Sequence, residues 1–468
     1  MQEMRRTLSP VIVAFFLVFL FLASCTKDET LAPIILPQEN PEASSFSSEV
    51  VLEWYLLFEE IDRYATGFRP PASARALAYI GLAGYEAAVP GMLEYNSFGN
   101  FYQGLDLPNI TPEARYHWPI AVNAAYFEII KAFYPHLSQE LNIKIADTYF
   151  RLFNKWSNEV PNSVAERSKN FGAEVGQAVY EWSSKDLVGH EAYLRNHDPD
   201  YIPPDGEGLW HPTAPDFTPA LFPFWGEVRT FAMVQRDLIG QPHLPYSTSP
   251  NSQFYLQAKE VQVWADEVKA GNDQEGKWMG EFWSDDVPRQ TFTPPGRWIA
   301  IANQILEIEG SNLDEAVVLY AQIGMALCDA GIAVWKSKFH YNLERPIDYI
   351  RRNIDSEWTT NLNNYISNFI GKNPNFPAYP SGHAGFGAAA AYILAEKFGN
   401  NYSFTDFCHQ DRTEFIGTPR SFKSFTDMAY ENGLSRIPLG VHFRMDSDEG
   451  LRLGYLAGEK VLDLPWLQ

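Results

Sequence analysis

Long segments with apolar residues at helical spacing restrict this chain to a helical fold. Apolar side chains recur in them every three to four positions, which is the period of an α-helix, whereas the alternating patterns of strands are scarce. The pattern predicts helices at residues 50–64, 72–88, 118–133, 137–156, 164–182, 251–270, 297–309, 313–337, 355–370, 384–398, 421–434 and 442–462. With 46% hydrophobic and 15% aromatic residues in 468, the chain can bury a large core.

Residues 187–250 interrupt the helical pattern with a high density of Pro, Gly, Asp, Trp and Tyr. A segment of this length without helices is typical of an ordered, functional loop region. We therefore expect an all-α fold of two helical bundles packed together, with long ordered loops between them. One catalytic unit would cover residues 49–468, with an N-terminal bundle at 49–186 and a C-terminal bundle at 251–468.

The N-terminus has the pattern of an exported lipoprotein. Two arginines precede an apolar run at residues 11–22, and the tetrapeptide LASC at 22–25 resembles a bacterial lipobox. This predicts a signal peptide at 1–24, lipidation of Cys25 and a flexible tether at 25–48. An uncleaved N-terminal anchor is the alternative.

The charged residues KDE at 27–29 resemble the surface-export signal of lipoproteins in Bacteroidetes-type bacteria. We accordingly expect a protein anchored by lipid in the outer membrane, facing the periplasm or the cell surface. The net charge of −22 argues against nucleic acid as a partner. Cys328 and Cys408 would be either a single disulfide or, as a simpler interpretation, two buried free thiols.

The segment FPAYPSGHAG, at residues 376–385, has the features of an anion site. Its prolines cannot lie inside a helix, but the alanine-rich sequence after it is a strong helix former, so Ser381 is predicted to lie where a helix begins. Free backbone N–H groups at a helix start bind anions, and Gly382 leaves them accessible. His383 adds a titratable group beside that position.

Two further segments carry basic residues that could share such a site. Lys338 and Arg345 lie seven positions apart, so on one helix they would face the same way, although Pro346 favours a helix end at Arg345. Arg436 and His442 follow, with Asp446 one helical turn after the histidine and placed to orient its ring. Taken singly, each pair is also compatible with a solvated surface.

Together the three segments resemble the signature blocks of one superfamily. Lys338-x6-Arg345-Pro346, Pro380-Ser381-Gly382-His383 and Ser435-Arg436-x5-His442-x3-Asp446 are similar, in this order, to blocks shared by type 2 phosphatidic acid phosphatases, bacterial acid phosphatases and vanadium-dependent haloperoxidases. The resemblance extends more weakly upstream to residue 282. Among these enzymes the chain most resembles a vanadium-dependent haloperoxidase of bacterial type.

The resemblance implies a role for each residue of the three blocks. His442 would bond to vanadium in a peroxidase or to phosphorus in a phosphatase, with Asp446 orienting it, and His383 would act as acid or base on the opposite side. The residues implied to bind the equatorial oxygens of vanadate are Lys338, Arg345, Arg436, Ser381 and Gly382. The resemblance also implies that phosphate can occupy the same site when vanadate is absent.

Two aromatic residues favour peroxidase chemistry by the same resemblance. Trp335 and Phe376 occupy positions similar to those that line the halide pocket, and Phe376 argues against the algal bromide type. The hypothesis is therefore a haloperoxidase that oxidises iodide, bromide or chloride with hydrogen peroxide, with or without an organic acceptor. The alternatives are an exported acid phosphatase that uses His442 as nucleophile, and a glycan-binding surface lipoprotein.

Several other polar residues are weaker candidates. Asp285 and Asp286 would supply a buried carboxylate paired with Arg345 or Arg436, or lie in a surface turn. The acidic loop at 198–207 could bind calcium but lacks the spacing of an EF-hand. Among the other histidines, His211 is a candidate for lining the entrance to the site, and we expect His340 and His409 to be structural.

Overall fold

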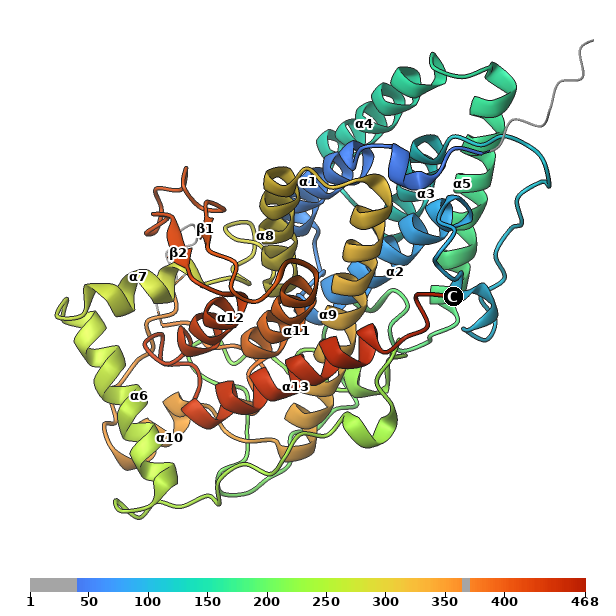
Figure 1. Cartoon of the computed structure of the whole chain (residues 1–468). Helices are drawn as coiled ribbons and strands as arrows, with labels where there is room; N and C mark the ends of the chain where they lie inside the picture. Colours follow the sequence, from blue (N-terminus) through green and yellow to red (C-terminus); the bar gives the residue numbers. More distant parts are fainter. Residues whose placement is uncertain (1–39, 364–370) are drawn as a thin grey trace, which may run out of the picture. The chain divides into compact units, whose positions relative to one another are not determined.

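The computed structural model describes residues 40–363 and 371–468, and the regular secondary structure in those ranges is almost entirely helical (Figure 1). The α-helices of the first half are α1 (Glu49–Tyr64), α2 (Pro70–Ala88), α3 (Trp118–Phe133), α4 (Gln139–Ser157) and α5 (Asn162–Ser184). Those of the second half are α6 (Gln253–Lys269), α7 (Gln274–Phe282), α8 (Pro294–Glu309), α9 (Leu313–Tyr341), α10 (Pro346–Asn353), α11 (Gly382–Phe398), α12 (Phe425–Leu434) and α13 (Arg444–Leu462). In the described residues the one sheet is an antiparallel pair, β1 (Phe404–Asp406) with β2 (Arg420–Phe422), in which Phe404 faces Phe422. The all-α prediction is confirmed.

The predicted signal peptide, the lipobox and most of the tether lie outside the described residues. The end of the predicted tether, residues 40–48, contacts the helical fold. Asn40 donates a side-chain hydrogen bond to the Ala114 carbonyl, and the Trp118 indole donates to the Pro41 carbonyl at 2.6 Å. Residues from 40 onward therefore pack against the loop before α3 and the start of that helix.

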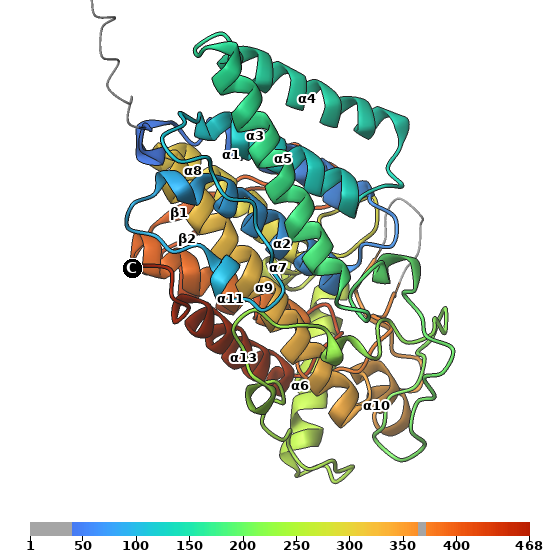
Figure 2. The ribbon, with the colours of Figure 1, turned by 90° about the vertical axis from the view of Figure 1, so that its right-hand side faces the viewer.

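Helix α9 forms the centre of the core, with α2 beside it and α11 and α13 on its other side (Figures 1 and 2). Two glycines allow α2 and α9 to approach closely. A Cβ on Gly81 would lie 2.7 Å from the Tyr320 carbonyl oxygen, and one on Gly324 would lie 2.7 Å from that of Leu77. Within the described ranges, α9 is the helix long and apolar enough to cross a bilayer, but 94% of its most apolar window is buried inside the protein.

The segment between α5 and α6 contains no α-helix and is held against α9 by side chains of that helix. The buried carboxylate of Asp329 accepts hydrogen bonds from the backbone N–H groups of residues 231, 232 and 233, each at 2.8 Å. The Trp335 indole donates to the Leu221 carbonyl at 3.2 Å. These contacts fix a long loop next to the end of α9 where the basic residues lie.

The structure differs from the predicted helices in three places. Residues 355–363 are not helical, because polar side chains bond to distant backbone groups; the Asn361 amide donates to the Ala265 and Pro438 carbonyls. The remainder of that predicted helix, residues 364–370, lies outside the described residues. The helix predicted from residue 421 begins at Phe425, where Ser424 caps it, and residues 420–422 form β2 instead. Helices α7 and α10 were not predicted.

Candidate active site

The FPAYPSGHAG segment leads into α11 at the predicted position. Ser381 is the N-cap residue, and its hydroxyl oxygen accepts a bond from the Ala384 N–H at 3.5 Å. Its own N–H donates to the Asp446 carbonyl at 2.8 Å, which ties the start of α11 to the first turn of α13. Gly382 faces the ring of Trp335, which a Cβ on the glycine would approach to 3.3 Å.

Lys338 and Arg345 converge on the same backbone segment. Helix α9 ends at Tyr341, so the two do not share a helix face; Arg345 lies beyond that helix in the extended conformation that Pro346 favours, as the residue before α10. Lys338 Nζ donates to the carbonyls of Pro377 at 2.8 Å and Ala378 at 2.9 Å. Arg345 Nε donates to the Phe376 carbonyl at 2.8 Å. Three consecutive carbonyl groups therefore position the two cations.

His442 lies just before α13 and is oriented by Asp446 in its first turn. The Asp446 carboxylate accepts from His442 Nδ1 at 2.9 Å and from the Phe443 N–H at 2.9 Å. Because the proton is then on Nδ1, Nε2 carries the lone pair of the neutral ring. Arg345 Nη1 lies 3.2 Å from that nitrogen. The His-Asp pair is thus buried, and its acceptor nitrogen is next to a guanidinium group.

His383 and Arg436 are linked to the turn that follows α7. The His383 ring donates a hydrogen bond to the backbone of Asp285. Since Nε2 has no partner among the described residues, the donor is Nδ1 and Nε2 is the free acceptor. Arg436 Nη1 donates to the Trp283 carbonyl at 3.3 Å.

The site concentrates positive charge where water is excluded. Lys338 and Arg345 are completely buried, and Arg436 is 2% exposed. Burial lowers the pKa of Arg345 to about 9 and that of Arg436 to about 10, and it places the pKa of Lys338 well below its usual value, with Arg345 as a second cause. In the described part of the chain, none of the three has a carboxylate within 4.0 Å.

The two histidines of the site are neutral, in contrast to these cations. Burial lowers the pKa of both His383 and His442 well below the usual value. The charge of Arg436 lowers the pKa of His383 further, and the charge of Arg345 does the same for His442. Burial raises the pKa of Asp446 to about 7, against the opposing charge of Lys338. Two neutral imidazoles therefore face a cluster of cations.

The residues in this cluster fit a small oxyanion. Arg345 Nη2, Arg436 Nε and His383 Nε2 are buried and have no hydrogen-bond partner among the residues that the structure describes. Buried polar groups normally have partners, and an anion would supply acceptors for the guanidinium donors. A tetrahedral or bipyramidal anion such as phosphate or vanadate has the required charge and several acceptor oxygens.

A cavity of about 130 Å³ reaches this cluster. Its walls include Gly382, His383, Arg436 and His442, whereas Lys338, Arg345 and Ser381 are fully buried. Both predicted halide-pocket residues, Trp335 and Phe376, are lining residues, with ring centroids 5.0 Å apart. The structure therefore brings the predicted site residues together around one cavity.

Comparisons with known proteins agree with the three sequence blocks. Residues 318–465 match the family model of the second helical-bundle domain of vanadium chloroperoxidase. The vanadium chloroperoxidase of Curvularia inaequalis is 24% identical over 510 residues, covering 89% of this chain and 82% of that protein. A crystal structure of a bacterial vanadium-dependent iodoperoxidase superposes with a TM-score of 0.79 at 26% identity, over 92% of this chain and 99% of that one. The chain is therefore similar to vanadium haloperoxidases in both sequence and fold.

A second solved structure extends the agreement in fold. A holo-type bacterial vanadium-dependent chloroperoxidase superposes with a TM-score of 0.61 at 14% identity, over 89% of this chain and 97% of that one. The proteins similar in sequence are a vanadium chloroperoxidase and a bacterial vanadium-dependent iodoperoxidase, whereas this second structure supports the fold alone. The region matched by the family model contains all three blocks, from Lys338 to Asp446.

The acidic pair after α7 is placed differently from either expectation. Asp285 is 3% exposed and lies 3.7 Å from Arg297, with Arg436 as a more distant electrostatic neighbour. Burial raises the pKa of Asp285 to about 7. Asp286 pairs with Arg69 at 2.6 Å. Neither carboxylate forms an ion pair with Arg345 or Arg436 among the described residues. The sequence did not predict the role of Arg297 as a partner of Asp285, because no motif surrounds it.

The weaker candidates lie away from the cluster. His211 and His340 are exposed and are not among the residues lining the cavity, whereas His409 is buried and contacts Arg297. Residues 198–207 form an exposed loop, and no group of three His, Cys, Asp or Glu side chains in the described residues is arranged to hold a metal ion. Cys328 and Cys408 are free thiols, so the disulfide alternative is wrong; Cys328 is buried and Cys408 is half-buried.

Proposed function

We propose that this protein is a vanadium-dependent haloperoxidase that oxidises a halide with hydrogen peroxide. The observation that carries the proposal is the cluster of Lys338, Arg345 and Arg436, which are buried without carboxylate partners among the described residues; Arg345 Nη2 and Arg436 Nε are also unpartnered donors there. These three side chains, with Ser381 and Gly382 at the start of α11, would hold vanadate by its oxygens, and His442 would bind the metal. Bound vanadate supplies a Lewis acid that activates hydrogen peroxide.

The histidines of the chain have complementary tasks in this proposal. Because Asp446 accepts a hydrogen bond from Nδ1, His442 would have a lone pair on Nε2 available to bind the metal. His383 presents a free Nε2 from the start of α11, so it can accept a proton from peroxide and return it to the departing oxygen. Its lowered pKa keeps the ring in the form that accepts protons.

The aromatic pair gives the halide an apolar wall. Trp335 and Phe376 are 1% and 7% exposed and lie beside the cations, with Lys338 Nζ 5.0 Å from the Phe376 ring centroid. A weakly hydrated anion can approach such a wall while the nearby positive charge offsets its own. We therefore infer that the halide is oxidised on this side of the cavity.

The test is halide oxidation by purified protein loaded with vanadate, measured with iodide, bromide and chloride in turn. We expect turnover that requires both vanadate and peroxide and that is lost in His442→Ala. Full activity in that variant would show that the site is assigned wrongly. The competing acid phosphatase function predicts the opposite pattern: no oxidation of any halide, together with phosphate-ester hydrolysis that vanadate inhibits.

We also propose that the mature protein is lipid-anchored at Cys25 in the outer membrane. The support is the lipobox-like sequence LASC at residues 22–25. Cys25→Ala should release the protein from the membrane fraction, and the mass of the wild-type N-terminal peptide should show acyl chains on Cys25. A wild-type peptide that starts at Met1 would refute this cleavage.

A further inference from the structure

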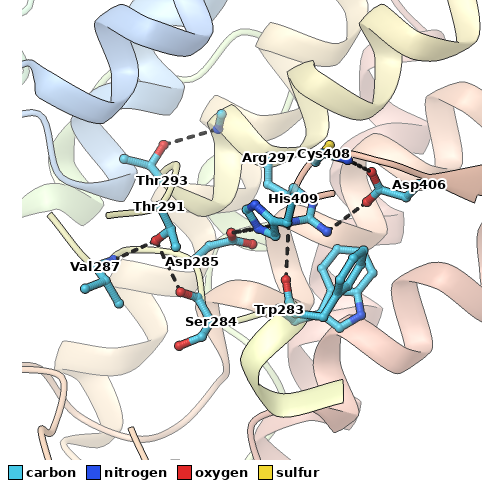
Figure 3. A network of polar contacts seen from close by, with 12 residues as sticks. Trp283, Ser284, Asp285, Val287, Thr291, Thr293, Arg297, Asp406, Cys408 and His409 are labelled. Atoms are coloured by element: carbon cyan, nitrogen blue, oxygen red, sulfur yellow. Dashed lines mark hydrogen bonds and ion pairs between the residues drawn. The ribbon is translucent and has the colours of Figure 1, made fainter. Parts of the chain in front are cut away.

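Arg297, in the first turn of α8, is the centre of a buried polar network beside the site (Figure 3). Its side chain is 0% exposed. Nη2 donates to Asp406 Oδ2, at the end of β1, at 2.8 Å, and Nη1 donates to the Phe282 carbonyl at 3.2 Å. Nη1 also contacts Nε2 of His409, whose pKa burial lowers well below its usual value, so the neutral ring can accept.

The same guanidinium is packed on the turn that follows α7, residues 282–285. It lies over the rings of Phe282 and Trp283, with Cζ 4.4 Å and 4.8 Å from their centroids. The Asp285 carboxylate, 3.7 Å away, completes the contact. Arg297 therefore touches this turn through a backbone carbonyl, two aromatic rings and a carboxylate.

The turn also holds two residues of the proposed active site. The Trp283 carbonyl accepts from Arg436 at 3.3 Å, and the Asp285 backbone accepts from the His383 ring. The 282–285 turn therefore contacts Arg297 and also contacts Arg436 and His383. A shift of the turn would move both acceptors.

Stability alone is a weak reason for this arrangement. An arginine and an aspartate that are both fully buried lose their hydration, and a buried ion pair often stabilises a fold no more than apolar residues of the same volume would. What an ion pair provides, and apolar packing does not, is a fixed direction for each hydrogen bond. Here one such bond is directed at the Phe282 carbonyl.

We propose that Arg297, with Asp406 as its counter-charge, is a positioning residue for the active site: it fixes the 282–285 turn, whose carbonyl groups orient Arg436 and the His383 ring. This rests on the proposed function, because it assigns those two residues to anion binding and proton transfer. Without the Asp285 acceptor the His383 ring could rotate or change tautomer, and its free Nε2 would no longer point into the cavity. Without a fixed Trp283 carbonyl, Arg436 would lose the contact that directs its unpartnered Nε.

The test compares two conservative variants. Arg297→Lys keeps the charge but has no fork, so it cannot bond to Asp406, His409 and the Phe282 carbonyl together. Arg75→Lys is the matched control, because Arg75 is also buried, pairs with Asp186 at 3.3 Å, donates to the Ser183 carbonyl at 2.7 Å and does not line the cavity. Both should lower the melting temperature, so stability does not discriminate between them.

The discriminating measurements are the dissociation constant of sulfate, by calorimetry, and the separate values of kcat and of KM for the halide. We expect Arg297→Lys to weaken sulfate binding and to lower kcat, each by about 10–100-fold, as is typical when a partner of a ligand-binding residue is lost. The KM for the halide should change by less than about twofold, because Arg297 is far from the aromatic wall. Arg75→Lys should leave all three values unchanged.

The proposal is overturned if sulfate affinity and kcat in Arg297→Lys stay within about twofold of wild type, or if Arg75→Lys lowers them equally. If Arg297→Lys does not fold, Arg297→Gln combined with Asp406→Asn decides by the same criteria, since it replaces the buried ions with a neutral pair. Sulfate binding requires no peroxide chemistry. A wild-type protein that binds sulfate but oxidises no halide would therefore refute the proposed function, and Arg297 would still be judged by sulfate affinity.

Discussion

Anion binding at this site should weaken steeply with rising pH because Lys338 is buried without a carboxylate partner. Its Nζ donates to two backbone carbonyls and lies next to Arg345, so burial and like charge hold its pKa well below the usual value. A bound dianion favours the charged ammonium and raises that pKa. Whenever the pH lies between the pKa of the free site and that of the complex, binding takes up one proton.

The size and sign of the effect follow from that proton. Below the free-site pKa, Lys338 is charged in both states and affinity does not vary with its titration. Above it, the affinity falls about tenfold, or about 1.4 kcal/mol, for each pH unit until the pKa of the complex is reached. Burial lowers the pKa of Arg345 to about 9 and that of Arg436 to about 10, so near and above those pH values the two arginines add slope of the same sign.

Calorimetric titration with sulfate between pH 8 and 10 measures this slope, since sulfate remains a dianion throughout. Asp446, with a pKa of about 7, is already ionised at the start of the range. The matched variant is Lys338→Arg, which replaces the ammonium group with a guanidinium of higher intrinsic pKa and should show a smaller slope. Equal slopes in the two proteins, or a flat profile in wild type, would refute the assignment of Lys338 as the titrating anion ligand; circular dichroism at each pH checks that the fold persists.

Three further substitutions separate the roles assigned to other residues. Asp446→Asn should lower vanadate affinity by about 10–100-fold, because the amide orients His442 less firmly than the carboxylate does; an unchanged dissociation constant in equilibrium dialysis would contradict this. His383→Ala should bind sulfate nearly as wild type does but lose about 10²–10⁴-fold in kcat, and a larger loss in binding than in kcat would count against the acid-base role. Asp62→Ala removes the acceptor for Thr293 at the start of α8 and should cost about 1–3 kcal/mol in the free energy of unfolding by urea, with vanadate affinity unchanged in the folded protein.

The parts of the site that the sequence predicted are those carried by side chains in short motifs. The position of Ser381 follows from the local rules of helix start, and the extended conformation of Arg345 follows from Pro346. Asp446 was expected one helical turn after His442, but α13 begins at Arg444, so this contact forms across the helix start and not within the helix. Lys338 and Arg345 do not share a helix, because the chain turns out of α9 before Arg345. Their convergence depends on the carbonyl groups of residues 376–378, and a backbone carbonyl leaves no signal in a sequence.

The parts that the sequence did not predict depend on contacts between distant segments. Arg297 meets Asp406 across 109 positions, and neither lies in a recognisable pattern. The helix predicted at 355–370 shows the same limit, since Asn361 bonds to the backbone near α6 and after α12 rather than within its own segment. Tertiary hydrogen bonds of this kind override local helical preference.

The way each buried cation is held distinguishes the site from the rest of this acidic chain. Arg297 and Arg75 are also buried, but each contacts a carboxylate, Asp406 or Asp186, that cancels its charge. Lys338, Arg345 and Arg436 are held instead by carbonyl oxygens, which fix a donor without supplying a full negative charge. Positive charge therefore survives at one place in a protein of net charge −22, and an anion is what such a place stabilises. These buried basic residues can bind an anion because carbonyl oxygens hold them in place, whereas carboxylates would neutralise their charge.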